Sequence, residues 1–353
     1  MKAKIIGAVI LIVVIACAAG YYFYGKAVDV TVINGYLGGE KIGIMEDEQI
    51  TDILAKKYHI AFDYSRAGSL DMVTADQSGR DYLFPSSRTA LEYYKEQHGE
   101  PVSDEIIFNT PIVLYSHKAV AEALMTDGTV TLSEGVYYAD MKKLTDKITS
   151  GVSWAEAGLP ELYGNVSVDT TDPVRSNSGN MFAALLANVL CGGKTADEES
   201  VKEIMPQLKS IFADLGYMET SSSDLFNQFI RTGIGAKPII AGYENQLLEY
   251  AAENPEQYKK IAEDIVIIYP TPTLWSTHIY IALDETGKQG AAALCDEKVQ
   301  QLAWEKHGFR TSGCDISSEG GDGRVAGIAP ELNAVINMPD YKVMKIIMEE
   351  LEE

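Results

Sequence analysis

Short polar side chains gather beside glycine or proline in several segments that separate apolar runs. Each segment places hydroxyl, amide or carboxylate groups where a strand is expected to end or a helix to begin. Helix starts leave backbone N–H groups unpaired, and several that converge can bind a small anion, although a serine before a helix is more often only its cap. The segments are 35–40, 67–69, 85–88, 109–110, 176–179, 241–244 and 275–277.

Charged and aromatic side chains in or near these segments bear on the ligand. A carboxylate that faces the site repels an anion, so an inward Glu40 or Asp71 would favour an amine or a metal-containing ligand, whereas outward ones would be solvated. Arg88 and Arg175 can neutralise an anion through paired N–H bonds or form salt bridges instead. The rings of Tyr243 and Trp275 can stack on a ligand or pack in the core.

No catalytic motif stands out in the sequence. The GxSxG and GxxxxGK[ST] patterns are missing, and the histidines show no HExxH spacing. No Cys/His spacing supports zinc. We therefore expect a protein that is not an enzyme and that has no metal or cofactor. The histidines are His59, His98, His117, His278 and His307.

The excess of acidic over basic residues argues against nucleic acid as a partner. The chain has 51 acidic and 29 basic residues and a net charge of -22, with the acidic residues spread along its length. Binding to nucleic acid requires clustered Lys and Arg to neutralise phosphates. We therefore expect no nucleic-acid partner.

The first residues are typical of an exported, membrane-tethered protein. Lys2 and Lys4 precede an apolar run over 5–20 that continues through aromatic residues to 24, which is long enough to cross a bilayer as a helix. We expect 1–26 to be a transmembrane anchor with the remaining chain outside the cytoplasm. The segment 14–17 also resembles a lipoprotein cleavage box, in which Cys17 would be lipidated, and simple secretion is a third alternative.

The other cysteines do not form a disulfide framework. Cys191, Cys295 and Cys314 are odd in number and scattered. They allow at most one bridge, for which Cys295 with Cys314 is the pair to test, and three buried thiols are an equal alternative.

Strand and helix patterns alternate along the chain, which predicts an α/β fold. We expect a strand over 28–34, a loop over 35–39, a helix over 47–58 and a strand over 60–64. Further expected helices are 86–98, 178–191, 289–307 and 340–352, and further extended runs are 106–116, 265–269 and 279–283.

Two of the extended runs contain prolines, near 111 and 270–272, and suit crossings between two lobes. We expect a first lobe from 27–113, a second from 114–269 and a return to the first over 270–353. Each lobe is expected to hold a mixed, mostly parallel sheet flanked by helices.

Three short motifs resemble the type 2 periplasmic-binding-protein family. They are Ala67-Gly68-Ser69, the turn 172–179 that opens an apolar helix, and the element 304–310. The chain is similar in particular to the molybdate, sulfate and phosphate binders over about 28–312. Carried over by position, the resemblance implies ligand contacts from Ser69, Ser86 or Ser87, Thr110, Ser178 and Tyr243, to which we add the neighbouring Glu40, Asn177 and Thr277.

The resemblance implies an extracytoplasmic solute-binding protein. Two lobes would close on a small polar or anionic ligand and deliver it to the permease of an ABC-type importer. The alternative is a membrane-tethered adaptor or sensory component with the same fold and no transport role, which the predicted uncleaved anchor keeps open.

Overall fold

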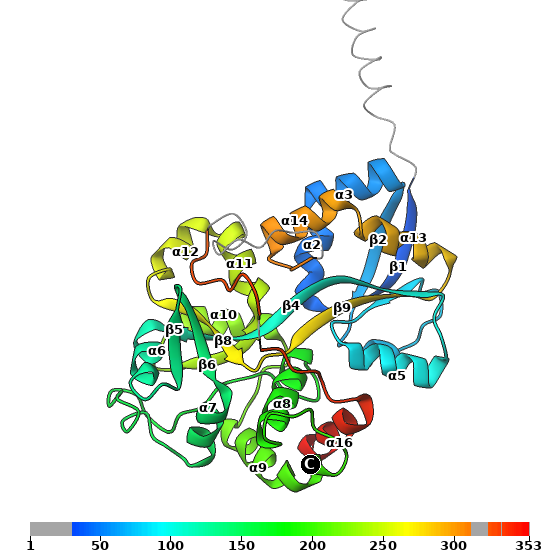
Figure 1. Cartoon of the computed structure of the whole chain (residues 1–353). Helices are drawn as coiled ribbons and strands as arrows, with labels where there is room; N and C mark the ends of the chain where they lie inside the picture. The colour runs from blue at the N-terminus through cyan, green and yellow to red at the C-terminus, as the bar shows by residue number, and fades with distance from the viewer. Residues whose placement is uncertain (1–29, 312–323, 333, 353) are drawn as a thin grey trace, which may run out of the picture.

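A computed structural model describes residues 30–311, 324–332 and 334–352. Two sheets share one long strand, β4, and helices cover their faces (Figure 1). The strands are β1 (Thr31–Leu37), β2 (Ile60–Arg66), β3 (Tyr82–Phe84), β4 (Ser103–His117), β5 (Val130–Ser133), β6 (Val136–Asp140), β7 (Ile239–Tyr243), β8 (Ile265–Thr271) and β9 (Trp275–Ala282). The helices are η1 (Gly39–Lys41), α2 (Ile42–Glu46), α3 (Glu48–Ile53), η2 (Leu54–Tyr58), α4 (Asp71–Thr74), α5 (Arg88–His98), α6 (Lys118–Met125), α7 (Met141–Thr149), α8 (Asn177–Leu190), α9 (Ser200–Leu215), α10 (Ser222–Thr232), α11 (Glu244–Glu253), α12 (Pro255–Ile261), α13 (Glu285–Leu294), α14 (Glu297–His307) and α16 (Tyr341–Glu352).

Sheet A contains β1, β2, β3, β9 and the first part of β4. Side chains alternate across it, as the pleat of a strand requires. Tyr82 and Phe84 of β3 join a core beneath α13 and α14, whereas Leu83 faces the opposite side with residues of α4 and α5. The sheet is therefore buried on both faces at β3, whereas the edge strand β2 is partly exposed.

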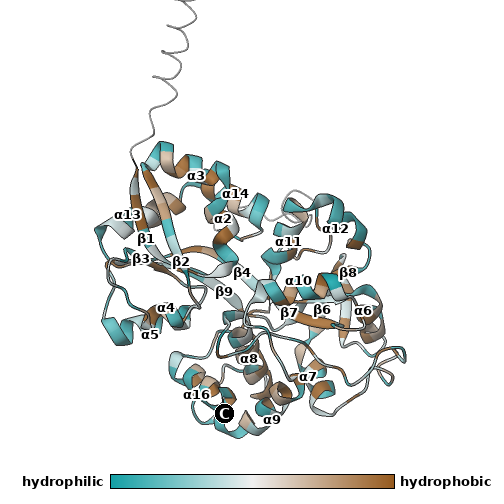
Figure 2. Ribbon diagram, turned by 180° about the vertical axis from the view of Figure 1, so that it is seen from behind, coloured by the Kyte–Doolittle hydropathy of each residue, from teal (hydrophilic) through white to brown (hydrophobic). Residues whose placement is uncertain are grey.

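Sheet B contains β5, β6, β7, β8 and the second part of β4. Ile112 and Leu114 face a core built with α8 and α9, and Val113 and Tyr115 face a core built with α10 and α11. In Figure 2, β7 is largely hydrophobic, whereas hydrophilic residues cover much of the outer helices α5 and α12.

The crossing over 106–116 is one continuous strand, with Pro111 at the point where β4 changes partner. Up to Pro111 the strand pairs with β9, and from Ile112 onward it pairs with β7 and β8. A proline has no N–H to donate, so it is tolerated where one ladder ends and the next begins. The chain crosses again from β8 to β9, which lie side by side with β4.

Several expectations about individual elements are wrong. The pairing is not mostly parallel, because β4 and β9 run antiparallel to their neighbours and β1–β2, β1–β3 and β6–β8 are the parallel pairs among the described strands. The strand β1 continues through Gly35, where the ring of Tyr82 leaves no space for a Cβ. The helix expected over 289–307 is two helices, because Asp296 caps α14 through the N–H groups of Lys298 and Val299.

The last helix contacts elements on the sides of both sheets. Val343, Met344 and Ile347 of α16 pack in the core that contains α8 and α9, and the ring of Tyr341 stacks on that of Tyr93 in α5 at 4.5 Å between centroids. Val325 and Ile328 likewise join the core of sheet B. The described residues after 323 therefore pack chiefly on the side of sheet B.

Two predictions fall outside the described residues. The anchor over 1–26, with Cys17, is one of them, and within the described ranges no helix has the length and hydropathy needed to cross a membrane. Cys191 and Cys295 are free thiols, and Cys314 is not among the described residues.

Candidate functional site

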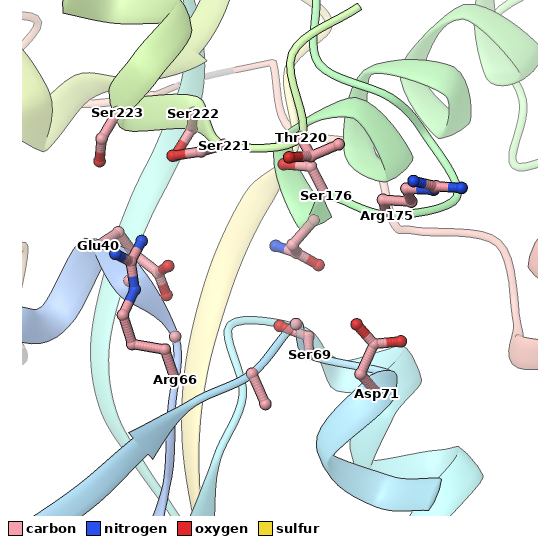
Figure 3. A pocket seen from close by; sticks show the side chains of 15 residues that line it. Glu40, Arg66, Ser69, Asp71, Arg175, Ser176, Thr220, Ser221, Ser222 and Ser223 are labelled. Atoms are coloured by element: carbon pink, nitrogen blue, oxygen red, sulfur yellow. The ribbon is translucent and has the colours of Figure 1, made fainter. Parts of the chain in front are cut away.

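A polar cleft of about 330 Å³ lies where loops from the side of sheet A meet helix starts from the side of sheet B (Figure 3). The side of sheet A contributes the turn after β1, which includes the start of η1, and the turn from β2 to α4. Sheet B contributes the first residues of α8 and α10. The residues that line the cleft are Gly38, Gly39, Glu40, Arg66, Ala67, Gly68, Ser69, Asp71, Arg175, Ser176, Asn177, Thr220, Ser221, Ser222 and Ser223.

Two helices begin at the cleft. Ser176 is the N-cap of α8, and Ser221 is the N-cap of α10, where its hydroxyl accepts from the N–H of Asp224. The first N–H groups of a helix lack partners within it, and the helix dipole places a partial positive charge there. The hydroxyls of Ser222 and Ser223 lie at the same helix start (Figure 3). This side of the cleft favours an anionic group.

Arg66 brings a full positive charge to the opposite side. It is the last residue of β2, its side chain is exposed, and no acidic group within the described ranges lies at ion-pair distance from it. Its guanidinium lies against Gly39, where a Cβ would be 2.7 Å from Nη2. Arg175 also lines the cleft, with its Nε 3.8 Å from Oδ2 of Asp172. Guanidinium groups match the geometry of carboxylates and phosphates.

Beneath Arg66 lies a buried group of charged and polar side chains. Lys41 is completely buried, and its ammonium contacts the Oε1 atom of Glu40. The same ammonium donates to the hydroxyl of Ser86 at 2.8 Å and lies 3.2 Å from Nδ1 of His278. The Ser86 hydroxyl also donates to Oε1 of Glu40. The side chain of Glu40 is 12% exposed and lines the cleft.

The charges in this group set the protonation of its members. Burial alone would raise the pKa of Glu40, but the charge of Lys41 and the hydrogen bonds from Lys41 and Ser86 lower it to about 2. Burial lowers the pKa of His278 well below its usual value, and the charge of Lys41 adds to this effect. Glu40 is therefore ionised and His278 neutral at physiological pH.

Asn177 connects the two sides of the cleft. Its amide nitrogen donates to the hydroxyl of Tyr243 at 2.9 Å and to the carbonyl of Ser86 at 3.2 Å. Ser178 lies deeper, with its hydroxyl 2.7 Å from that of Thr171. Asn177 thus joins the start of α8 to the loop that follows β3.

The structure brings together only some of the residues proposed from the sequence. Glu40, Ser69 and Asn177 line the cleft, although the hydroxyl of Ser69 accepts from the N–H of Ser86. Three others lie behind the lining and bond to protein groups: Ser86, Ser178 and Tyr243.

The remaining proposed contacts lie away from the cleft. Thr110 is fully buried and accepts from the N–H of Asn245. Thr277 pairs with Asn109 in the ladder between β4 and β9. Ser87 is the buried N-cap position of α5. None of the three lines the cleft, because the sequence order of loops does not show which strand ends meet in space.

Sequence reasoning missed Arg66, Lys41 and the run 220–223. Four consecutive hydroxyl residues at the start of an amphipathic helix are a signal that was available in the sequence. Arg66 directly precedes the turn 67–69, which was recognised. No sequence signal indicated that Lys41 is buried, since two of the residues around its ammonium, Ser86 and His278, are 45 and 237 residues away along the chain.

The described residues contain no group of His, Cys, Asp or Glu side chains arranged to hold a metal ion. The polar lining of the cleft instead consists mainly of hydroxyl groups, with two arginines and two carboxylates. This arrangement suits reversible binding of a small charged or polar molecule.

Comparison with known proteins supports the fold. No family model matches the chain, and no curated protein has a similar sequence. Solved structures do share its fold. A putative extracellular solute-binding protein from Bordetella parapertussis has a TM-score of 0.59 at 9% identity, covering 92% of this chain and 98% of that one.

Two further solved structures share the same fold. The substrate binding protein of an ABC transporter from Agrobacterium tumefaciens has a TM-score of 0.57 at 13% identity, covering 93% of this chain and 96% of that one. The sulfate-binding protein SubI from Mycobacterium tuberculosis H37Rv has a TM-score of 0.54 at 11% identity, covering 91% and 95%. The resemblance to type 2 periplasmic-binding proteins is therefore confirmed at the level of the fold.

Proposed function

We propose that this chain, which has the type 2 periplasmic-binding-protein fold, is an extracytoplasmic solute-binding protein that captures a small polar or anionic ligand. The observation that carries the proposal is the cleft of about 330 Å³, in which the starts of α8 and α10 face Arg66 across the junction of the two sheets. Helix N-termini, hydroxyls and a guanidinium together form a binding surface for an anionic group. No step of chemistry is needed for this role.

We further propose that the sheets belong to two lobes that close on the ligand. The strand β4 and the segment from β8 to β9 would be the crossings, since both pass from one sheet to the other. Asn177 and Ser86 would approach from opposite lobes, so their contact belongs to the closed arrangement. The apolar side chains of α16 pack with α8 and α9, so we propose that this helix moves with the second lobe, although Tyr341 also stacks on Tyr93 of α5.

Delivery to a transporter is part of the same proposal. Two of the similar structures are described as an ABC transporter's substrate binding protein and a sulfate-binding protein. We propose a permease of an ABC-type importer as the partner of this chain, with the segment 1–26 holding it at the outer face of the membrane by a helix or by lipid at Cys17.

The alternative role, a tethered adaptor without a ligand, has one observation in its favour. The hydroxyls of Ser86, Ser178 and Tyr243 already bond to protein groups. The adaptor remains the weaker candidate, because the cleft keeps a polar lining from both sides and Arg66 has no acidic partner among the described residues.

Thermal unfolding of the full-length chain tests the proposal. The protein is heated alone and with each member of a panel of anions, metals, amino acids and sugars. A specific ligand at a hundred times its dissociation constant stabilises the folded state by about 2.7 kcal/mol. The absence of a shift with every compound, together with no co-purified ligand in native mass spectrometry, would contradict the proposed function.

A matched pair of variants locates the site. Arg66→Gln removes the charge that faces the cleft, and we expect ligand affinity to fall about tenfold or more, since a hydrogen bond to a charged group contributes about 1.5–3 kcal/mol. Arg231→Gln removes the same charge at the far end of α10 and is expected to leave affinity unchanged. Equal affinities of both variants would rule out this cleft.

A further inference from the structure

The cleft lining contains as many acidic as basic side chains. Glu40 and Asp71 supply two carboxylates, and Arg66 and Arg175 supply two guanidinium groups. In Figure 3, Glu40 and Arg66 lie at one end of the cleft and Asp71 and Arg175 at the other. A site built for an anion alone gains nothing from carboxylates in its lining, because like charges repel.

The two oxygens of Glu40 have different surroundings. Oε1 is held by Lys41 and by the hydroxyl of Ser86. Oε2 has no hydrogen bond to another described residue, and the side chain reaches the cleft. One oxygen therefore anchors the carboxylate, while the other is left as an acceptor for a group in the cleft.

Lys41 does not supply a positive charge to the cleft. It is completely buried, and it is surrounded by Glu40, Ser86, His278 and the ring of Phe84, whose centroid lies 4.9 Å from the ammonium. Its charge is balanced by Glu40, so what the pair presents at the cleft surface is a carboxylate oxygen. An anionic ligand oxygen at that position would face a second acceptor, whereas an N–H donor would complete its bonding.

The opposite wall has the reverse preference. The N-caps Ser176 and Ser221 mark two helix starts, and the hydroxyls of Ser222 and Ser223 add donors. This wall favours the negative end of a ligand. The two walls together therefore prefer opposite charges on one molecule.

We propose that the ligand of this cleft is a small zwitterion, with an ammonium group that donates to Oε2 of Glu40 and a carboxylate or phosphonate group at the starts of α8 and α10. The inference rests on the proposed function and specifies its ligand class. Glu40 is then a specificity-determining residue, and Lys41 and Ser86 are positioning residues that hold it.

Calorimetric titration of the full-length chain with matched compounds tests the inference. The pairs are β-alanine with propionate and 3-aminopropylphosphonate with propylphosphonate, and each pair differs in the amine. We expect the aminated member of at least one pair to bind about tenfold tighter or more, as expected for a hydrogen bond to a charged group. Equal or tighter binding of the amine-free members would overturn the inference and leave the proposed function intact.

A second outcome separates the two proposals. If none of these compounds and no member of the wider panel binds, the proposed function itself fails, and the ligand class fails with it. Binding of sulfate or phosphate more tightly than of every aminated compound would keep the function and contradict the zwitterion.

Variants assign the preference to Glu40. The double variant Glu40→Gln/Lys41→Met keeps the buried group neutral, and we expect the two members of a pair to bind within about twofold of each other. Asp52→Asn/Lys56→Met removes an exposed ion pair outside the cleft and should keep the full preference.

If the double variant does not fold, the single variant Glu40→Gln is titrated with the same pairs of compounds. Glutamine keeps the size of the side chain and an acceptor for the hydroxyl of Ser86. A preference for the amine that persists in a folded variant at position 40 would overturn the assignment.

Discussion

Removing the buried charge of Glu244 should destabilise the protein more than removing the charge of any exposed side chain. Glu244 is fully buried at the start of α11, and Arg310, which follows α14, is 4% exposed. Arg310 donates from Nε to Oε2 of Glu244 at 2.6 Å and from Nη2 to Oε1 at 2.5 Å. The hydroxyl of Tyr269 also donates to Oε1, and Nη2 of Arg310 donates to the carbonyl of Ala329 at 2.6 Å.

The size of the effect follows from burial. Glu244→Gln leaves the guanidinium of Arg310 without a counter-charge in a site with little water, and it turns one acceptor of the carboxylate into a donor. Breaking a buried ion pair in this way costs about 3–5 kcal/mol. In the wild type, the charge of Glu244 and its hydrogen bonds raise the pKa of Arg310 against the opposing effect of burial. Without Glu244 the guanidinium still keeps its proton, because arginine is protonated in proteins at all ordinary pH values, so Arg310 cannot escape the penalty by becoming neutral.

Urea unfolding of the full-length chain, followed by tryptophan fluorescence, measures this cost. With a slope of about 3 kcal/mol per molar, the midpoint should fall by about 1 M or more. Glu256→Gln is the control, because it breaks an ion pair in which the side chains of Lys259 and Glu256 are 69% and 76% exposed. This variant should change the free energy of unfolding by less than about 0.5 kcal/mol.

A second variant separates charge from packing. Glu244→Leu/Arg310→Met replaces both members of the pair, so no unpaired charge remains, and it should recover most of the lost stability. A change of less than about 1 kcal/mol for Glu244→Gln, or an equal loss in the double variant, would refute the reasoning.

Three further changes have expected outcomes. The pKa of Glu40 is lowered from 4.5 to about 2, so its contribution to stability is complete above pH 4.5 and is lost as the pH falls towards 2; thermal melts should show the gap between wild type and Glu40→Gln closing over that interval. Gly179→Ala places a Cβ 2.1 Å from the carbonyl oxygen of Thr171 and should cost about 1–3 kcal/mol in urea unfolding, whereas Gly235→Ala, with no atom within 4 Å, should be neutral or slightly stabilising. Asn177→Ala removes the bonds to Tyr243 and Ser86 and should weaken ligand binding about tenfold by calorimetry, so unchanged affinity would count against a role for Asn177 at the cleft.

Elements with strong local signals were predictable from the sequence. The helix expected over 178–191 is α8, because its apolar positions repeat at helical spacing and Gly192 and Gly193 follow its end. Both glycines have positive φ, which favours glycine over other residues. The break between α13 and α14 was missed, because an aspartate within a helical pattern marks a cap only when the chain turns there.

The site was less predictable because it depends on which loops meet. Ser86 and Ser178 lie in segments that were recognised, but their hydroxyls bond to neighbouring side chains and not to the cleft. The run 220–223 comes from a helix start far along the chain from Arg66, and the two crossings between the sheets, β4 and the segment from β8 to β9, bring the two sides together. The sequence shows which hydroxyl and charged residues the loops contain, but it does not show which of these side chains face the cleft.

The most direct test of the proposed function is a crystal structure of the protein with the tightest-binding compound of the panel. The account predicts electron density in the cleft, with the negative end of the compound at Ser176 and Ser222 and within reach of Arg66. Density in another cavity, such as the one of about 490 Å³ beside Trp154 and Ser167, with the cleft empty, would contradict it.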